Sequence, residues 1–170
     1  TVITTGPNSG GKTRFLQAIA LSQLLGQVGC FVPAREASIR LVSGMFVSLG
    51  EAPHADQKEG RLGMELTRVR SLFEHAKGGS MVVLDELCSG TNPSEAEEIF
   101  RLVLELLAEI KPQVFISTHF LHFAERLRDE GEVPGLSFLQ VELDADQRPT
   151  YRFLPGVAST SLARMTAERL

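Results

Sequence analysis

The sequence predicts an α/β domain whose mainly parallel sheet is flanked by helices and carries antiparallel strands at its margin. Short apolar or β-branched segments alternate with longer segments of helical periodicity, which is typical of this class. A glycine-rich turn links the first strand to the first helix. The chain of 170 residues is long enough to bury one compact core. We therefore expect residues 1–170 to form a single domain.

The expected strands differ in composition according to their place in the sheet. Buried parallel strands are nearly continuous in apolar or β-branched residues. This pattern covers residues 1–5, 80–86 and 113–117. Residues 136–143 and 149–154 are an expected antiparallel pair around a polar turn. Residues 39–49 contain β-type stretches broken by Ser43-Gly44, and this pattern predicts a hairpin.

Apolar residues recur with helical spacing in several segments that are bounded by Gly, Pro or polar residues. The expected helices are residues 12–28, 62–76, 93–110, 120–128 and 159–170. Pro93 or Ser94 opens the third of these, and the Glu residues near its start suit the helix dipole. Residues 50–60 are polar and contain Pro53, so we expect a loop there.

The turn after the first strand reads GPNSGGKT and matches the phosphate-loop pattern G-x-x-x-x-G-K-[ST] in full. Glycines let backbone N–H groups turn inward around an anion, and the helix N-terminus adds positive potential. Lys12 is expected to reach the β- and γ-phosphates, and the Thr13 hydroxyl to hold Mg²⁺. The expected nucleotide-binding residues are Gly6, Pro7, Asn8, Ser9, Gly10, Gly11, Lys12 and Thr13.

Polar residues follow two further apolar strands. Asp85 and Glu86 come at the end of MVVLDE, where ligands of a parallel sheet bind. Asp85 is expected to hold Mg²⁺ and Glu86 to polarise an attacking water. His119 ends the run FISTH and is a candidate sensor of the γ-phosphate, against the alternative of a histidine that only caps the next helix. The expected catalytic residues are thus Glu86, His119 and Lys12.

These features together favour one class of nucleotide-binding protein. Phosphate-loop kinases usually add an arginine-bearing lid and lack an Asp-Glu pair followed by a strand-end His. GTPases need a base-reading N-K-x-D, which does not occur in the sequence. The combination resembles the ATP-binding-cassette type, in which a glutamate activates water. We therefore expect a phosphate-loop (P-loop) NTPase fold with ATP and Mg²⁺ as its cofactors.

Composition limits the partners and the compartment. The formal net charge of −4 argues against this segment alone as a strong nucleic-acid binder. No apolar run is long enough to span a bilayer, so no membrane partner is expected. Cys30 and Cys88 are far apart and without a CxxC pattern, which predicts free thiols in a reducing cytosol. A cytoplasmic location follows as the expectation.

Motifs along nearly the whole chain carry a family resemblance. GPNSGGKT has a Pro-Asn and paired glycines, FVPA follows the first helix, LDELCSGTNP joins the acidic pair to a Gly-Thr turn, STHF holds the histidine, and the segment YRFLPGVASTS lies near the end. In this order they resemble the ATPase domain of the MutS family of DNA mismatch-repair proteins. The turn Gly90-Thr91-Asn92-Pro93 is more similar to divergent MutS-related proteins than to the mismatch-sensing members.

The resemblance implies an ATPase that works as a homodimer or with a MutS-like partner subunit. Each nucleotide would lie near the partner, with Gly90, Thr91 and Asn92 at the interface. ATP turnover would then rearrange the dimer and the clamp that grips DNA. DNA would be held by domains outside this chain, which is expected to be a fragment of a longer protein.

One departure from the family pattern concerns the contact across the dimer. In the family, a serine before the acidic strand reaches the nucleotide of the other subunit. EGRLGMEL, at the corresponding place, contains neither Ser nor Thr. The backbone N–H of Gly60 and the Arg61 side chain are the substitutes that this position offers. Gln57 could approach the metal or water, or be a solvated loop residue.

Three alternatives remain open at this stage. A transporter-type ATP-binding cassette normally has an LSGGQ-like signature before the acidic strand, and none occurs in the sequence. A structural-maintenance or recombination-type ATPase would have coiled-coil arms, and no heptad run interrupts the chain. A nucleotide-dependent interaction module with little turnover is the third, and the intact Lys12, Asp85 and Glu86 argue against it.

Overall fold

The computed structural model describes residues 1–7, 9–49 and 61–159, without the side chains of residues 61 and 62. Within this part of the chain, strands form a six-stranded sheet in the order β2-β3-β4-β1-β5-β6. The strands are β1 (Val2–Thr5), β2 (Met45–Ser48), β3 (Met81–Leu84), β4 (Gln113–Thr118), β5 (Ser137–Leu143) and β6 (Pro149–Pro155). Neighbouring strands run parallel except β5 and β6, which are antiparallel at the margin.

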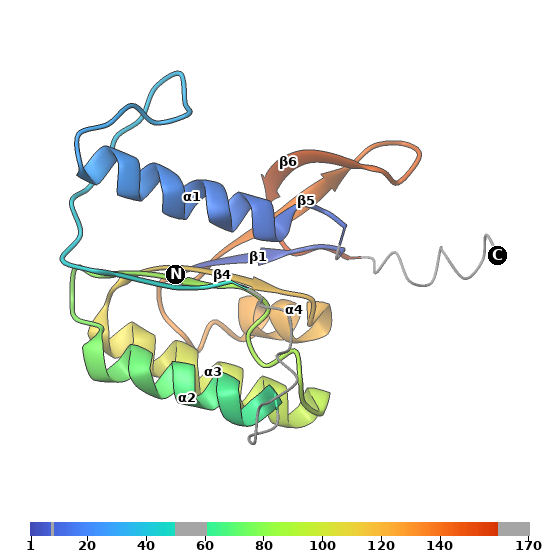
Figure 1. Ribbon diagram of the computed structural model, residues 1–170. Coiled ribbons are helices and arrows are strands. Elements are labelled where there is room, and N and C mark those ends of the chain that lie inside the picture. The colour runs from blue at the N-terminus through green and yellow to red at the C-terminus, as the bar shows by residue number, and fades with distance from the viewer. Residues whose placement is uncertain (8, 50–60, 160–170) are drawn as a thin grey trace.

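Helices cover both faces of the sheet (Figure 1). The described helices are α1 (Lys12–Gln27), α2 (Arg61–His75), α3 (Pro93–Ile110) and α4 (Leu121–Glu130). Helix α1 lies alone on one face, and α2, α3 and α4 lie on the other (Figure 1). The β5–β6 hairpin forms one edge of this sheet and projects on the side of α1 (Figure 1).

Two apolar clusters hold these layers together. The larger one lies between the sheet and α2–α4, and includes Phe100 and Phe123 in edge-to-face contact with ring centroids 5.4 Å apart. The smaller one joins Leu16 of α1 to Met81 and Val83 of β3. Because β3 is buried along its whole length, its side chains pack alternately into the two clusters. This explains why MVVL is continuous in apolar residues.

Helix α3 begins directly after the loop that follows β3. The Asn92 side chain accepts a hydrogen bond from the Ser94 N–H at 3.1 Å, and Pro93 occupies the first turn. Both are common at helix N-termini, because the cap satisfies a free N–H and Pro lacks one. The helix ends at Ile110, and its C-cap residue, Lys111, has a left-handed φ of 58°. The ends of α3 thus follow from local residue chemistry.

The predicted α/β class with a mainly parallel sheet is confirmed, as are the helices that begin near residues 12, 62, 93 and 120 and the marginal antiparallel pair. The expected loop at 50–60 and helix at 159–170 lie outside the described residues, apart from residue 159.

The hairpin predicted over residues 39–49 is wrong. Residues 45–48 form β2, which instead pairs in parallel with β3. The backbone before β2 is bound by two glutamine side chains of α1. Gln27 donates to the Val42 carbonyl and accepts from the Val42 N–H, both at 3.0 Å, and Gln23 donates to the Arg40 carbonyl at 2.9 Å. These contacts satisfy backbone groups that a hairpin partner would otherwise have to satisfy.

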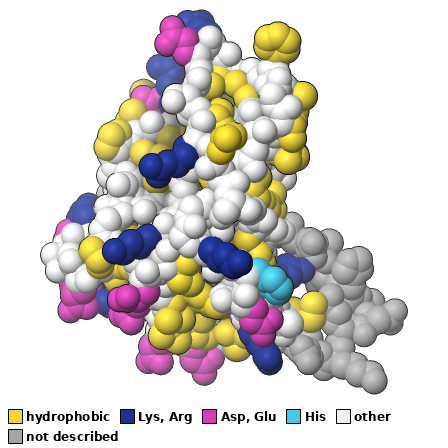
Figure 2. Space-filling model, turned by 90° about the vertical axis from the view of Figure 1, so that its left-hand side faces the viewer, with side chains coloured by type: hydrophobic (Ala, Val, Ile, Leu, Met, Phe, Trp, Pro, Cys, Tyr) yellow, Lys and Arg dark blue, Asp and Glu magenta, His cyan; other side chains and the backbone are white. Residues whose placement is uncertain are grey.

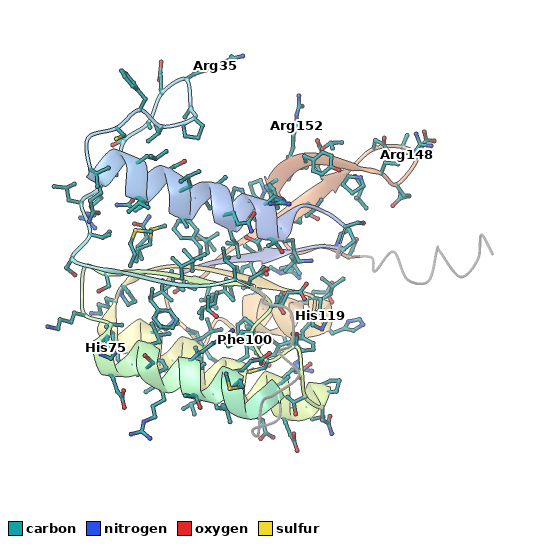
Figure 3. All side chains as sticks on the ribbon, viewed as in Figure 1. Arg35, His75, Phe100, His119, Arg148 and Arg152 are labelled. Atoms are coloured by element: carbon teal, nitrogen blue, oxygen red, sulfur yellow. The ribbon has the colours of Figure 1, made fainter. Side chains whose placement is uncertain are left out.

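The face at the amino-terminal ends of the parallel strands lies opposite the predicted site. Its Lys and Arg side chains are scattered among hydrophobic and acidic ones (Figure 2). His75, at the end of α2, lies on this side of the molecule (Figure 3). None of the described helices is long and apolar enough to cross a membrane.

The two cysteines are free, as predicted. Cys30 is exposed after α1, whereas Cys88 is fully buried in the loop after β3. Burial, with a smaller effect of the nearby Glu65 carboxylate, raises the pKa of the Cys88 thiol to about 12. Cys88 therefore behaves as a small apolar core residue.

Candidate functional site

The predicted site residues come from the carboxyl ends of three neighbouring strands. Strands β3, β4 and β1 are adjacent in the sheet and parallel, so the segments that follow them emerge at one edge. These segments carry Asp85 and Glu86, His119, and the phosphate loop. Figure 3 places His119 at this edge and His75 at the opposite one.

The phosphate loop makes a tight turn between β1 and α1. The Gly10 N–H donates to the Pro7 carbonyl at 2.9 Å, and Gly11 caps α1 with a φ of 84°. A Cβ on Gly10 would stand 2.8 Å from Val141 Cγ2 and 3.0 Å from the Pro7 oxygen. Only glycine therefore fits at position 10 without displacing its neighbours. Gly6 and Gly10 are buried and Ser9 is exposed, whereas Asn8 lies outside the described residues.

Lys12 lies buried under this loop, with only 2% of its side chain exposed. Its ammonium group donates to the Gly6 carbonyl at 2.9 Å and to the Pro7 carbonyl at 3.0 Å. The Glu86 carboxylate is 3.8 Å from the same nitrogen. Burial lowers the pKa of Lys12, while the charges of Glu86 and Asp85 act in the opposite direction. The cation is thus held between the loop carbonyls and the acidic pair.

Asp85 accepts hydrogen bonds from two hydroxyl groups on different elements. Thr13 Oγ1 donates to Asp85 Oδ2 at 2.7 Å, and Ser117 Oγ donates to Asp85 Oδ1. The first of these bonds joins residues 72 positions apart in the sequence. It brings the phosphate loop and the acidic pair into direct contact, as the sequence interpretation requires.

Glu86 follows the end of β3 in an unusual backbone conformation. Its φ of 50° lies in the left-handed region, which a residue with a Cβ seldom adopts. The turn directs the carboxylate toward Lys12 while 31% of the side chain stays exposed to solvent. A carboxylate that is both accessible to water and fixed near a cation can orient a water molecule.

His119 lies between β4 and α4. Its ring stacks in a tilted arrangement on Phe120 with centroids 4.2 Å apart. Its Nδ1 is buried and has no hydrogen-bond partner among the described residues. No hydrogen bond joins it to Lys12 or Glu86 in the same part of the chain, so its role as a γ-phosphate sensor stays a prediction. An unpaired ring nitrogen leaves capacity to bind a further polar group.

The expected interface residues form the turn between the acidic pair and α3. Gly90 and Asn92 are exposed and Thr91 is half-buried. Thr91 Oγ1 donates to Glu95 Oε2 at 2.9 Å, and Asn92 caps α3. These local roles account for the residue types, and the interface itself stays a prediction. Gln57 and Gly60, considered for a contact across the dimer, lie outside the described residues, as does the Arg61 side chain.

The sequence interpretation missed the contribution of the β5–β6 hairpin. Val141 of β5 packs on the phosphate loop, and Phe153 of β6 stacks on Phe15 of α1 with centroids 4.2 Å apart. The Tyr151 ring lies 3.1 Å from where a Cβ of Gly11 would stand, and 74% of this residue is exposed. The pairing of β5 and β6 changes register in this stretch and Tyr151 has a left-handed φ of 60°, so strand alternation in the sequence does not reveal where its ring lies.

The oxygen donors of Thr13 and Asp85 are chemically suited to a magnesium ion bound with a nucleoside triphosphate. The Thr13 hydroxyl and Asp85 carboxylate are adjacent hard oxygen ligands, as Mg²⁺ prefers. No group of three or more His, Cys, Asp or Glu side chains in the described residues could hold a metal by itself. Mg²⁺ sites commonly combine one or two protein ligands with phosphate oxygens.

Comparison with protein families matches residues 2–168 to MutS domain V. The chain belongs to the MutS domain V family. The resemblance deduced from the motifs is therefore confirmed. A protein named Endonuclease MutS2 from Thermomicrobium roseum is 34% identical over 99% of this chain and 21% of its own length.

Other proteins of the same name give a similar match to this MutS domain V chain. Those of Levilactobacillus brevis and Streptococcus sanguinis are each 33% identical over 172 aligned residues. The alignments cover 100% and 99% of this chain respectively, and 22% of each relative. The chain thus spans about a fifth of the length of these curated relatives.

Proposed function

We propose that this chain is a phosphate-loop ATPase domain, the motor of a MutS-like DNA repair or recombination protein. The observation that carries the proposal is the hydrogen bond between Thr13 and Asp85, with Lys12 held beside Glu86. These contacts support the proposal because they join the loop that would bind phosphate, the oxygen pair that would hold Mg²⁺ and the carboxylate that would position water. Membership of the MutS domain V family supports the link to DNA.

Each residue has a role that follows from its position. The loop N–H groups and Lys12 bind the phosphates, and Lys12 offsets their negative charge. Thr13 and Asp85 would hold Mg²⁺, which supplies Lewis-acid stabilisation of the phosphate oxygens. Glu86 orients the attacking water and accepts its proton. His119 would donate a hydrogen bond to the γ-phosphate through its ring.

ATP binding would also link this domain to a partner. The exposed Gly90-Thr91-Asn92 turn lies directly after the acidic pair, so a partner that contacts it lies close to the nucleotide. We propose a homodimer or a MutS-like partner subunit at this turn. Dimer closure on ATP and reopening after hydrolysis would then change the grip of attached domains on DNA.

The test of this function is ATP hydrolysis by the purified full-length protein, measured with Mg²⁺ and then with EDTA. We expect turnover that needs Mg²⁺ and changes when duplex or branched DNA is added. Binding of a fluorescent ATP analogue without any turnover would instead identify a nucleotide-dependent interaction module. If no adenine nucleotide binds, the proposed function is wrong.

Tyr151 adds a prediction about affinity. Its ring is exposed beside Gly11 at the rim of the phosphate loop, so it offers a face on which a nucleotide base can stack. We expect Tyr151→Ala to raise KM for ATP about tenfold, the effect of losing one base–aromatic contact, with little change in kcat. Tyr151→Phe, which keeps the ring, should match the wild type. A normal KM in Tyr151→Ala would exclude stacking at this residue.

A further inference from the structure

Ser117 is the one hydroxyl in the described part of the chain for which the structure records hydrogen bonds to both Asp85 and Glu86. It lies on β4 near its carboxyl end and is fully buried. Its Oγ donates to Asp85 Oδ1 and accepts from the Glu86 N–H at 3.0 Å. A hydroxyl can donate one hydrogen bond and also accept hydrogen bonds. Ser117 donates its hydrogen bond to the Asp85 carboxylate and accepts one from the Glu86 N–H.

Both contacts fall on groups whose orientation matters for the proposed chemistry. The bond to Oδ1 fixes the rotation of the Asp85 carboxylate, and this leaves Oδ2 facing Thr13. The bond from the Glu86 N–H anchors a backbone with a φ of 50°. Such a left-handed residue persists only where its surroundings hold it. Ser117 therefore supports the metal-binding oxygen and the water-positioning residue at once.

A purely structural explanation is that any buried hydroxyl at this level of the sheet helps the fold. Thr4 provides the comparison, because it is the register partner of Ser117 on the adjacent parallel strand β1. Register partners in parallel strands point to the same face of the sheet. Thr4 is also fully buried, yet its Oγ1 has no hydrogen-bond partner among the described residues. The fold thus accommodates the buried Thr4 hydroxyl although this hydroxyl makes no hydrogen bond to any described residue.

We propose that Ser117 is a positioning residue for ATP hydrolysis, which sets the geometry of Asp85 and Glu86 without touching the nucleotide. The inference rests on the proposed function. Removing the hydroxyl would release the Asp85 carboxylate and the Glu86 backbone together. Phosphate binding by the loop and Lys12 would continue, because neither bonds to Ser117 in the described structure. Turnover and the Mg²⁺ requirement should change more than ATP affinity.

The experiment compares Ser117→Ala with Thr4→Val in the full-length protein. Both remove a buried hydroxyl from the same sheet face, but only the first breaks bonds to the site. For Ser117→Ala we expect kcat to fall about 30-fold, equivalent to about 2 kcal/mol, with KM for ATP within about threefold of wild type. The Mg²⁺ concentration at half-maximal rate should rise. Thr4→Val should hydrolyse ATP at the wild-type rate.

Two further variants at the same position keep the result interpretable. Ser117→Thr retains the hydroxyl and should recover most of the turnover. Ser117→Cys replaces the hydroxyl with a weak donor and should be slow, so it substitutes for Ser117→Ala if that variant fails to fold. A Ser117→Thr protein with wild-type thermal stability but the low rate of Ser117→Ala would overturn the proposal.

The outcomes also separate this inference from the proposed function. Wild-type turnover that is lost in Glu86→Gln but kept in Ser117→Ala and Ser117→Cys overturns the positioning role alone. A raised KM with an unchanged kcat in Ser117→Ala also overturns it, because the residue would then act on binding. Absence of any turnover sensitive to Glu86→Gln overturns both.

Discussion

Glu86→Gln should retain ATP binding and lose turnover by about 100- to 1,000-fold, the contribution that a positioned general base makes. The amide cannot accept a proton from water, but it has nearly the same shape as the carboxylate. The left-handed turn and the hydrogen bond from its N–H to Ser117 involve only the backbone of residue 86, so the turn should persist. ATP affinity should be unchanged or higher, because a negative charge near the phosphates is removed.

Single-turnover hydrolysis and equilibrium ATP binding give the two measurements. Glu109→Gln is the matched control, because this exposed glutamate lies at the end of α3 away from the site. It should leave both values at the wild-type level. Turnover of Glu86→Gln close to wild type would show that another group positions the water.

Lys12→Met should weaken ATP binding about 100-fold, as expected when a charge-assisted contact to the phosphates is removed. Methionine fills a similar volume but has no donor for the Gly6 and Pro7 carbonyls, which now accept from the ammonium group. It also leaves Glu86 without its nearby cation. We therefore expect kcat to fall as well. Lys12→Met should thus lower both ATP affinity and turnover, whereas Glu86→Gln should lower turnover alone.

Isothermal titration with ATP and Mg²⁺ measures this loss. Lys77→Met removes an exposed lysine that lies between α2 and β3, at the opposite edge of the sheet, and should bind ATP normally. Thermal unfolding of Lys12→Met without nucleotide separates a binding defect from a folding defect. Full affinity in a folded Lys12→Met protein would remove Lys12 from the phosphate site.

The sequence was informative where local patterns determine structure. The motif GPNSGGKT predicted where α1 begins, because a turn of this pattern is typically followed directly by a helix. The apolar run before Asp85 predicted a buried strand, because only a central strand packs on both faces. The class of fold and most elements follow from such patterns, and so does the sheet edge at which we place the candidate site.

What the sequence left open depends on contacts between distant residues. The segment before β2 was expected as a hairpin, since nothing local reveals that Gln23 and Gln27 would bond its backbone. The double role of Ser117 depends on how β3 and β4 align and on the turn at Glu86. Neither the alignment of neighbouring strands nor a left-handed glutamate can be deduced from residue periodicity.

The close packing of Val141 on the phosphate loop limits which substitutions the loop glycines can accept. Substitution at Gly10 is blocked by Val141, and a bulkier side chain at 141 would press on Gly6 and Gly10 in turn. An alanine at position 10 therefore fits only if residue 141 has a smaller side chain than valine. Even then, the Cβ of that alanine would lie close to the Pro7 carbonyl oxygen. Positions 10 and 141 should consequently change as a pair, so the substitutions that the phosphate loop tolerates depend partly on a strand near the other end of the chain.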